Sequence, residues 1–210
     1  MIDLSGDNHV ARAPGDNSKY GVVLTWVNGY WWNGVPQQVG AYGTACNAMY
    51  VIDRSGDATV NRATADFVRD FNTLSNAIGR TCRFPVLVHS IQNQYVGQCA
   101  RATWNFQGYS FTTLCRQPIP NPNSRGTSIA YTAGAGISHY QPNTFIQRDF
   151  ADYNTTYSHV GHELSHAMGL DHSPEPSSLM YPFITTGVKK GYNTGDLVAL
   201  AAWYDTHVGP

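Results

Sequence analysis

The stretch that decides the fold is His162-Glu163-Leu164-Ser165-His166-Ala167-Met168-Gly169-Leu170-Asp171-His172. Its fixed positions read His-Glu-x-x-His-x-x-Gly-x-x-His. Histidines four residues apart project from one face of a helix, so His162 and His166 can share a metal ion. Gly169 lets the chain leave the helix in a conformation that costs other residues energy. We expect this bend to bring His172 back as a third ligand.

Three neutral imidazoles suit Zn²⁺, and three protein ligands leave a fourth position for water, which is typical of a catalytic site. Glu163 lies one residue from the first ligand, rotated by about 100° around the helix. We expect it to flank the metal, take a proton from the zinc-bound water and pass it to a leaving amine. His159, one turn earlier, is interpreted as a neighbour without a role. With this chain's composition, the five fixed positions match by chance in roughly one chain in 100,000.

The 210-residue chain is almost neutral and poor in charge. It has 13 Lys and Arg against 14 Asp and Glu, and charged residues make up 13% of it, against a usual share of roughly 25%. This balance argues against a nucleic-acid binder, which needs a cationic surface. No apolar run approaches the ~20 residues that span a bilayer. Glu163 is one of only two glutamates, so its place in the motif stands out.

A surface rich in hydrogen-bonding side chains favours an exported protein, and we expect an extracellular location. Residues 1–7 have neither a cationic start nor an apolar stretch, so no signal peptide is visible. The chain is therefore either cytosolic or a mature segment of a longer precursor.

Cysteine usage favours the second option. None of the four cysteines forms a Cys-x-x-Cys pair, which argues against a zinc ribbon or a thioredoxin motif. An even number in a chain of this composition suggests two disulfides in an oxidising compartment. Three pairings are open. We favour Cys46–Cys82 and Cys99–Cys115, because the latter closes a short segment of turn and strand residues. Four buried free thiols are the alternative.

Hydrophobic periodicity predicts an α/β order with one main sheet. Apolar residues recur at three- and four-residue steps in the first helix, and Gly79 supplies its end. Helices are expected at about 58–79, 155–168 and 194–206. Runs of β-branched and aromatic residues predict strands at about 20–27, 83–91, 128–133 and 144–148. The interval 92–126 is polar and turn-rich, with room for a hairpin.

A methionine follows His172 by eight residues, within Ser178-Leu179-Met180-Tyr181-Pro182. Together with the long histidine motif, this segment resembles the Met-turn of the metzincin zinc endopeptidases. Within that group, Gly169–Ser173 followed by Leu179–Pro182 is most similar to the matrixins, the matrix-metalloproteinase type. Small secreted bacterial metzincins are equally plausible relatives. The resemblance at the level of motifs runs from about 127 to 206 and includes Asp196.

This resemblance implies a single catalytic domain over residues 1–210. Residues 1–19 would form an N-terminal arm, and 20–168 an upper subdomain with a twisted mixed sheet and the active-site helix. Residues 169–210 would form a smaller lower subdomain with the Met-turn and a terminal helix. The substrate cleft would lie between the two subdomains.

The resemblance also implies roles for single residues. His162, His166 and His172 would bind the catalytic zinc, Glu163 would be the general base and acid, and Met180 would form an apolar floor beneath the metal. One edge strand would pair with extended substrate, and Met180–Ile184 would form the wall of the pocket for the residue after the scissile bond. The predicted substrate-binding residues are Ala130, Tyr131, Thr132, Tyr181, Pro182 and Phe183.

Two features depart from the matrixin pattern, and a third has two readings. Pro182-Phe183-Ile184 replaces the usual Pro-x-Tyr, and Pro182 stands where some metzincins carry a tyrosine that touches the metal, so no tyrosine ligand is expected. The pattern of a structural zinc site is not evident, and His89 and His139 are interpreted as ordinary core or surface residues. Asp149 and Asp152 are either calcium ligands or caps of the following helix.

We therefore expect a secreted, monomeric endopeptidase that acts on protein or peptide substrates through a zinc-bound water activated by Glu163. Neither nucleic acid nor a membrane span is expected. The alternative is a secreted binding protein on the same scaffold, with an inactive or highly restricted zinc site. Its ligand surface would be the aromatic stretch around Trp31 and Trp32, which otherwise covers a core edge.

Overall fold

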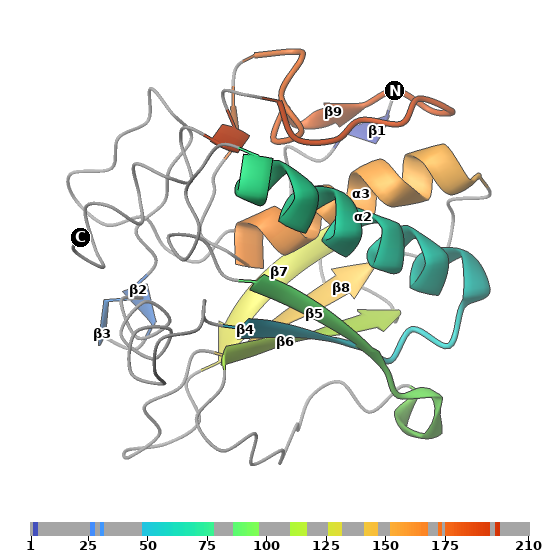
Figure 1. Cartoon of the computed structure of the whole chain (residues 1–210), viewed down its shortest axis with the longest axis vertical. Helices are drawn as coiled ribbons and strands as arrows, with labels where there is room; N and C mark the ends of the chain where they lie inside the picture. Colours follow the sequence, from blue (N-terminus) through green and yellow to red (C-terminus); the bar gives the residue numbers. More distant parts are fainter. Residues whose placement is uncertain are drawn as a thin grey trace.

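The computed structural model describes residues 2–3, 26–27, 30–31, 48–77, 86–96, 110–116, 126–131, 141–146, 152–167, 172–173, 175–193 and 196–197. Its centre is a five-stranded sheet in the order β5-β4-β6-β8-β7 (Figure 1). These strands are β4 (Ala48–Asp53), β5 (Val86–Ile91), β6 (Ser110–Arg116), β7 (Gly126–Tyr131) and β8 (Gln141–Ile146). Strands β5, β4, β6 and β8 run parallel, and β7 is antiparallel to β8 at one edge. The expected α/β fold with a mixed sheet is confirmed.

Two long helices lie on one side of this sheet, α2 (Ala58–Ala77) against β5 and α3 (Tyr153–Ala167) against β7 and β8 (Figure 1). Shorter elements are the 3-10 helix η2 (Asn93–Tyr95) and the strands β1 (Ile2–Asp3), β2 (Trp26–Val27), β3 (Tyr30–Trp31) and β9 (Phe183–Ile184). Strand β2 pairs with β3, and β1 pairs with β9, both antiparallel. In the part of the chain that is described, no helix is long and apolar enough to cross a membrane.

Helix α2 is amphipathic and packs through its apolar face. Its buried residues recur at helical spacing: Val60, Ala63, Thr64, Phe67, Val68, Phe71 and Ser75. Asp57 caps its start by accepting hydrogen bonds from the backbone N–H groups of Thr59 (2.9 Å) and Val60 (3.0 Å). Near its end, the Asn72 amide exchanges two hydrogen bonds with the Leu87 backbone. The exchange occupies the Leu87 backbone groups of β5, an outermost strand among those described, so α2 shields part of that edge from pairing.

Helix α3 begins at an aspartate cap. The Asp152 carboxylate accepts hydrogen bonds from the Thr155 backbone N–H (2.8 Å) and the Thr155 hydroxyl (2.6 Å). These bonds hold the pKa of Asp152 below its usual value. The structure thus places Asp152 as a helix cap. Asp149 lies outside the described residues, and calcium binding stays a prediction.

The predicted helices at 58–79 and 155–168 are confirmed, and so are the strands at 83–91, 128–133 and 144–148, each within a few residues. Strands β4 and β6 were not predicted. Strand β6 lies within the interval 92–126, which was expected to be polar and turn-rich with room for a hairpin, although its threonines are β-branched and favour strands. Its neighbours β4 and β8 pair with it on both sides, so tertiary pairing decides its conformation.

Several predictions fall mainly on residues outside the described part. Of the strand expected at 20–27, the structure describes Trp26–Val27, and of the helix expected at 194–206 it describes residues 196–197. Cys115 in β6 is fully buried and disulfide-bonded, whereas Cys46, Cys82 and Cys99 lie outside. The pairing of the cysteines and the division into two subdomains therefore stay predictions.

Candidate metal centre

Two of the predicted ligands meet at the end of α3. The Nε2 atoms of His162 and His172 are 3.2 Å apart, and their ring centroids are 5.1 Å apart. Nitrogen ligands about 2.0–2.1 Å from a tetrahedral zinc ion lie about 3.3 Å from each other. The spacing of these two imidazoles therefore fits zinc coordination. His162 is fully buried and His172 is partly exposed, which places the pair at the border between core and surface.

The backbone of the Met-turn orients His162. Nδ1 of His162 lies 2.9 Å from the carbonyl oxygen of Leu179. A carbonyl can only accept, so Nδ1 carries the proton and donates it. In the neutral ring, this tautomer leaves the Nε2 lone pair available for a metal. A backbone carbonyl that fixes the tautomer in this way is a usual outer partner of a metal-binding histidine.

His166 lies four residues after His162 in the same unbroken helix, as the motif predicts. Its side chain and Gly169 lie outside the described part. Among the described residues, no group of three His, Cys, Asp or Glu side chains is placed to hold a metal. The structure thus brings two of the three predicted ligands, His162 and His172, together. The complete set of three ligands stays a prediction.

Glu163 is fully buried, and one of its carboxylate oxygens lies 3.5 Å from Nε2 of His159, which is also fully buried. Sequence reasoning selected Glu163 but took His159 for a neighbour without a role. The spacing of four residues within a helix could have identified the contact, because such side chains lie on the same face. His159 therefore limits the position of the Glu163 carboxylate on one side.

The Met-turn is buried and held by hydrogen bonds. Ser178, Leu179 and Met180 are 2%, 1% and 2% exposed. The Met180 N–H donates to the Ser178 hydroxyl (2.9 Å), and the Met180 carbonyl accepts from the Ser173 N–H (2.9 Å). Ser173 directly follows His172. The turn is therefore tied to the neighbour of one candidate ligand and, through Leu179, to the other.

Asp196 joins the Met-turn to the following helical residues. Its buried carboxylate accepts hydrogen bonds from the Leu179 N–H (3.0 Å), the Asn193 N–H (2.9 Å) and the Ser178 hydroxyl. The Asn193 side chain in turn accepts from the Asp196 N–H (2.8 Å). This reciprocal pair is a capping box. The Asp196 carboxylate also binds the N–H of Leu179, and the carbonyl of Leu179 is the partner of His162.

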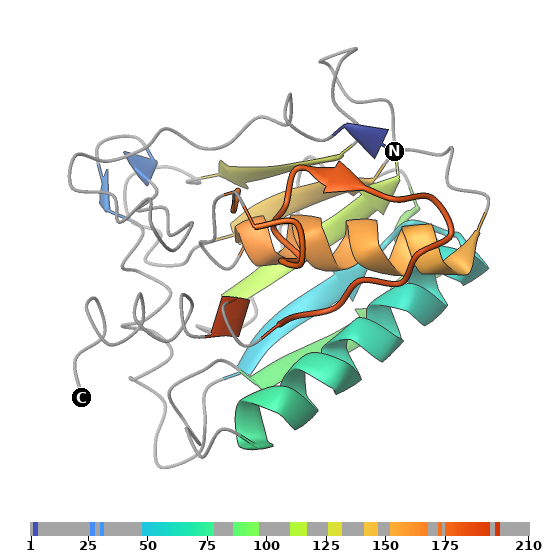
Figure 2. The same cartoon turned by 90° about the horizontal axis from the view of Figure 1, so that it is seen from above.

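A segment after the Met-turn, residues 187–192, lies along α3, and we call it the strap (Figure 2). The Gly187 N–H donates to the Thr155 hydroxyl (2.8 Å), and the Lys190 N–H donates to the Ser158 hydroxyl (2.7 Å). Further along, the Tyr192 hydroxyl lies 2.6 Å from the Ser165 hydroxyl. The strap therefore supplies partners to buried hydroxyls over most of the length of α3.

The predicted substrate-binding residues fall on two separate elements. Ala130 and Tyr131 are in β7, the outermost strand of the sheet among the strands that are described, and Thr132 lies outside. Tyr181, Pro182 and Phe183 are half-buried and follow the Met-turn. Phe183 opens β9, whose backbone pairs with β1 in the register Asp3↔Phe183 and Ile2↔Ile184. One edge of the predicted pocket wall is thus already paired within the chain.

Two other features lie away from the histidine pair. A cavity of about 550 Å³ lies between α2 and the strap, and none of the predicted site residues lines it. Within β5, His89 lies 3.3 Å from the fully buried Asp53 at the end of β4. Burial alone would raise the pKa of Asp53, but hydrogen bonds from His89 and Ser55 outweigh it and lower that pKa. His89 is thus a structural partner, as its interpretation as an ordinary residue implies.

Comparisons with known proteins agree with the motif. The matrixin family model matches residues 90–205. Interstitial collagenase of Bos taurus is 32% identical over 84 residues, which cover 39% of this chain and 18% of the collagenase. The Sus scrofa collagenase is 40% identical over 62 residues, or 28% and 13% of the two chains. The chain thus aligns with less than a fifth of the length of these relatives.

Among solved structures, metalloproteinase-II from Bacteroides fragilis aligns over 80% of this chain and 60% of that one, with a TM-score of 0.46 and 10% identity. The match to the family model covers more than half of the chain. It also includes the histidine motif and the Met-turn, and the predicted resemblance is confirmed. The chain belongs to the matrixin family of metallopeptidases.

Proposed function

We propose that this protein is a secreted zinc-dependent endopeptidase that hydrolyses internal peptide bonds. The observation that carries the proposal is the 3.2 Å approach of Nε2 of His162 to Nε2 of His172, ten residues further along the chain. Membership of the matrixin family supports the same class of activity. The charge-poor composition and the disulfide-bonded Cys115 support export.

His162, His166 and His172 would hold the zinc ion. When bound, zinc polarises a carbonyl oxygen and lowers the pKa of a water molecule. The Leu179 carbonyl favours the tautomer of His162 that has its proton on Nδ1. In this tautomer, Nε2 can bind zinc without first releasing a proton. The buried Met-turn holds the carbonyl that does so, and Asp196 holds the turn.

Glu163 is the proposed general base and acid. It adjoins His162 in the helix, and its carboxylate is fully buried, away from bulk water. It takes a proton from the attacking water and delivers it to the nitrogen of the departing amine. His159 contacts one carboxylate oxygen at 3.5 Å and so restricts the rotamers of Glu163. A carboxylate held in one position transfers the proton without first having to be reoriented.

An extended peptide is the proposed substrate form. Strand β7 lies at the sheet edge beside α3 and can add a substrate strand through its main chain. Tyr181, Pro182 and Phe183 would line the opposite wall, where the Tyr181 and Phe183 rings lie 5.5 Å apart. An aromatic wall of this kind favours an apolar residue after the scissile bond.

The test uses the full chain, casein and a quenched peptide library. We expect cleavage that a chelator abolishes and added zinc restores. Glu163→Gln should lower kcat/KM by roughly 10²- to 10⁴-fold while one zinc ion still binds per chain. The matched control is Glu175→Gln, because Glu175 is the only other glutamate and is exposed.

Wild-type activity in Glu163→Gln would contradict the proposed role of this carboxylate. Full zinc occupancy without cleavage across a broad library would favour the binding-protein alternative. Cleavage sites identified by mass spectrometry would show whether the residue after the scissile bond is apolar.

A further inference from the structure

We propose that Tyr192, in the strap, is a positioning residue for the metal-binding turn of α3. This inference rests on the proposed zinc site, but it concerns a side chain that approaches α3 from the strap and is not itself a ligand. Tyr192 lies 20 residues beyond His172, outside the histidine motif and the Met-turn. No sequence pattern pointed to it.

The hydroxyl groups of Tyr192 and Ser165 form a directed chain of hydrogen bonds. The Ser165 hydroxyl donates to the carbonyl oxygen of Gly161 at 2.6 Å. A serine hydroxyl has one hydrogen, so it accepts in its 2.6 Å contact with the Tyr192 hydroxyl. Tyr192 therefore donates to Ser165, which donates to Gly161. Each bond in such a chain polarises the next and strengthens it.

These hydrogen bonds lie at the two ends of the helical turn that contains His162 and Glu163, a proposed ligand and the proposed base. Gly161 directly precedes His162, and Ser165 lies between Glu163 and His166. At Gly161 the helix also touches α2, because a Cβ atom there would come within 2.7 Å of the Phe67 ring. The turn is thus pressed against α2 at its first residue and bonded to the strap at its last. A shift of Ser165 would move the backbone that presents two ligands and the proposed base.

The Tyr192 ring is itself held by α2. Its centroid lies 5.6 Å from that of Phe67 and 5.4 Å from that of Phe71, with tilted geometry. Aromatic pairs at these separations attract each other beyond simple burial. Packing against α2 therefore gives the Tyr192 ring a defined position, from which its hydroxyl reaches Ser165 of α3.

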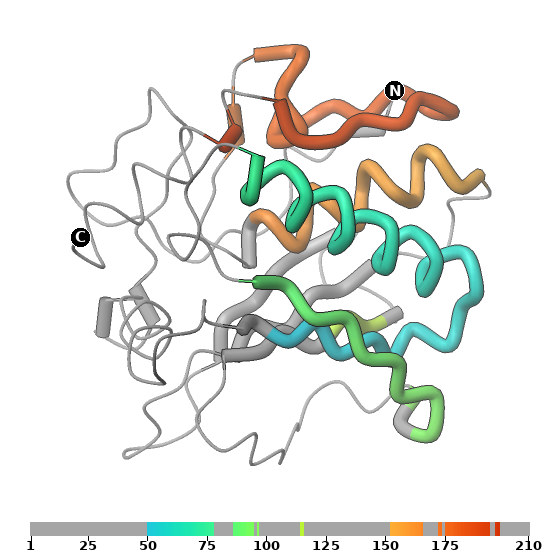
Figure 3. The backbone as a smooth tube through the Cα atoms, in the orientation of Figure 1, coloured from blue at the N-terminus to red at the C-terminus, as the bar shows by residue number. Residues whose placement is uncertain are grey.

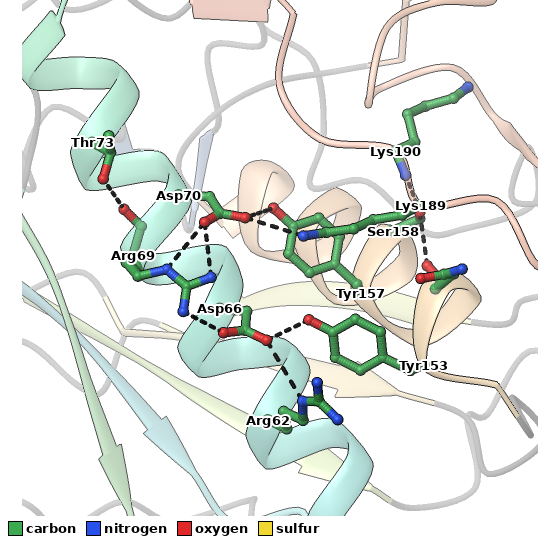
Figure 4. Close-up of polar contacts among 11 residues, drawn as sticks. Arg62, Asp66, Arg69, Asp70, Thr73, Tyr153, Tyr157, Ser158, Lys189 and Lys190 are labelled. Atoms are coloured by element: carbon green, nitrogen blue, oxygen red, sulfur yellow. Dashed lines mark hydrogen bonds and ion pairs between the residues drawn. The ribbon is translucent and has the colours of Figure 1, made fainter.

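Tyr157 offers a matched control on α3 itself. Its hydroxyl donates to the Asp70 carboxylate at 2.8 Å, and its ring packs edge-on against Phe67 at 6.0 Å. Tyr157→Phe removes one tyrosine hydroxyl and the hydrogen bond that it donates, as Tyr192→Phe does. Its bond, however, joins Tyr157 to Asp70 of α2 (Figure 4), and Tyr157 lies more than a turn before His162.

The experiment measures zinc affinity by competition with a chromophoric chelator in wild type, Tyr192→Phe and Tyr157→Phe. Loss of an outer-shell partner lowers metal affinity by about 10- to 100-fold, and we expect about 10-fold for Tyr192→Phe, because its effect passes through Ser165. Tyr157→Phe should change the affinity less than about 2-fold. Unfolding of the metal-free proteins should show a loss of stability in both variants that is at least as large in Tyr157→Phe, because its hydroxyl donates to a carboxylate. The visible spectrum of the cobalt-substituted protein should change only in Tyr192→Phe.

The outcomes separate this inference from the proposed function. A wild-type chain that binds no zinc would overturn both. Tight zinc binding by wild type together with unchanged affinity and cobalt spectrum in Tyr192→Phe would overturn only the positioning role. An equal loss of zinc affinity in Tyr157→Phe would also overturn it, because the effect would then be one of general stability. In the double variant Ser165→Ala/Tyr192→Phe, the loss should be smaller than the sum of the single losses.

Discussion

Helices α2 and α3 lie side by side on one face of the sheet (Figure 3). They nevertheless bury different kinds of side chain. The buried face of α2 is mainly apolar, with Val60, Ala63, Phe67, Val68 and Phe71. Helix α3 buries mostly polar residues, namely Thr155, Thr156, Ser158, His159, His162, Glu163 and Ser165. The difference shows that α2 is held by apolar packing, whereas α3 needs partners that other segments supply.

The physical reason is the cost of a buried polar group without a hydrogen bond, about 1–3 kcal/mol. The strap and the Met-turn bring such partners to α3 from sequence positions far beyond the helix. Because α3 carries so many buried polar side chains, it cannot be held mainly by apolar contacts. The apolar α2 then serves as the rigid support against which α3 and Tyr192 pack.

The comparison predicts its largest effect at Phe67, which is 1% exposed and touches both α3 and Tyr192. Phe67→Ala should lower the free energy of unfolding by about 3–5 kcal/mol, because it removes a buried ring that packs against Tyr157 of α3. Urea unfolding without metal measures this. Leu74→Ala, on the same helix but 37% exposed, should cost much less. Equal losses would show that α2 is not held by its apolar face.

A smaller effect is expected where α3 touches α2. Gly161→Ala places a methyl group within 2.7 Å of the Phe67 ring and should cost about 1–3 kcal/mol of stability through overpacking. In combination with Phe67→Ala, the added cost should nearly vanish, because the clashing ring is gone. Additive losses in a double-mutant cycle would mean that the cost at Gly161 arises elsewhere.

Acid should weaken the polar contact between the two helices. Burial raises the pKa of Asp70, but hydrogen bonds from Tyr157, Arg69 and Lys189 outweigh it and lower that pKa below its usual value of 3.8 (Figure 4). A lowered pKa means that the unfolded chain binds this proton more readily than the folded one. The contribution of Asp70 is therefore complete above its unfolded pKa and is lost as the pH falls through its folded pKa.

Asp70→Asn should accordingly flatten the dependence of unfolding free energy on pH between about pH 5 and pH 2. Chemical unfolding at several pH values measures the slope. Tyr157→Phe should reduce the slope less, since it removes only one of the three donors. An unchanged slope in Asp70→Asn would assign the acid sensitivity to other carboxylates.

The smallest effect is expected at the exposed rim of the same contact. Arg62 has a side chain 74% exposed, lies 3.8 Å from Asp66 and sits over the Tyr153 ring at 4.6 Å. Arg62→Ala should change stability by less than about 0.5 kcal/mol, because solvent and salt screen such pairs. Measurements at low and high salt should agree closely. A loss as large as that of Gly161→Ala would show that exposed charges, and not packing, join the helices.

The two helices also show which features of the fold can be predicted from the sequence. Helix α2 was located within two residues from its apolar spacing, since that pattern and the helix it predicts are both local. Helix α3 was located from its histidine motif, and its predicted neighbour His159 was assigned no role. Strand β6 was missed because its pairing partners, β4 and β8, come from distant parts of the chain.

The sequence by itself determined the family, the helical spacing of His162 and His166, and the place of Glu163 beside them, because these depend on residues within one or two turns. Only the tertiary structure decided that His172 comes within 3.2 Å of His162, that the Leu179 carbonyl orients His162, and that Tyr192 reaches Ser165. A hydroxyl, a carbonyl or an imidazole can bond to many partners. Which partner it meets depends on how distant segments pack, and no local pattern encodes that choice.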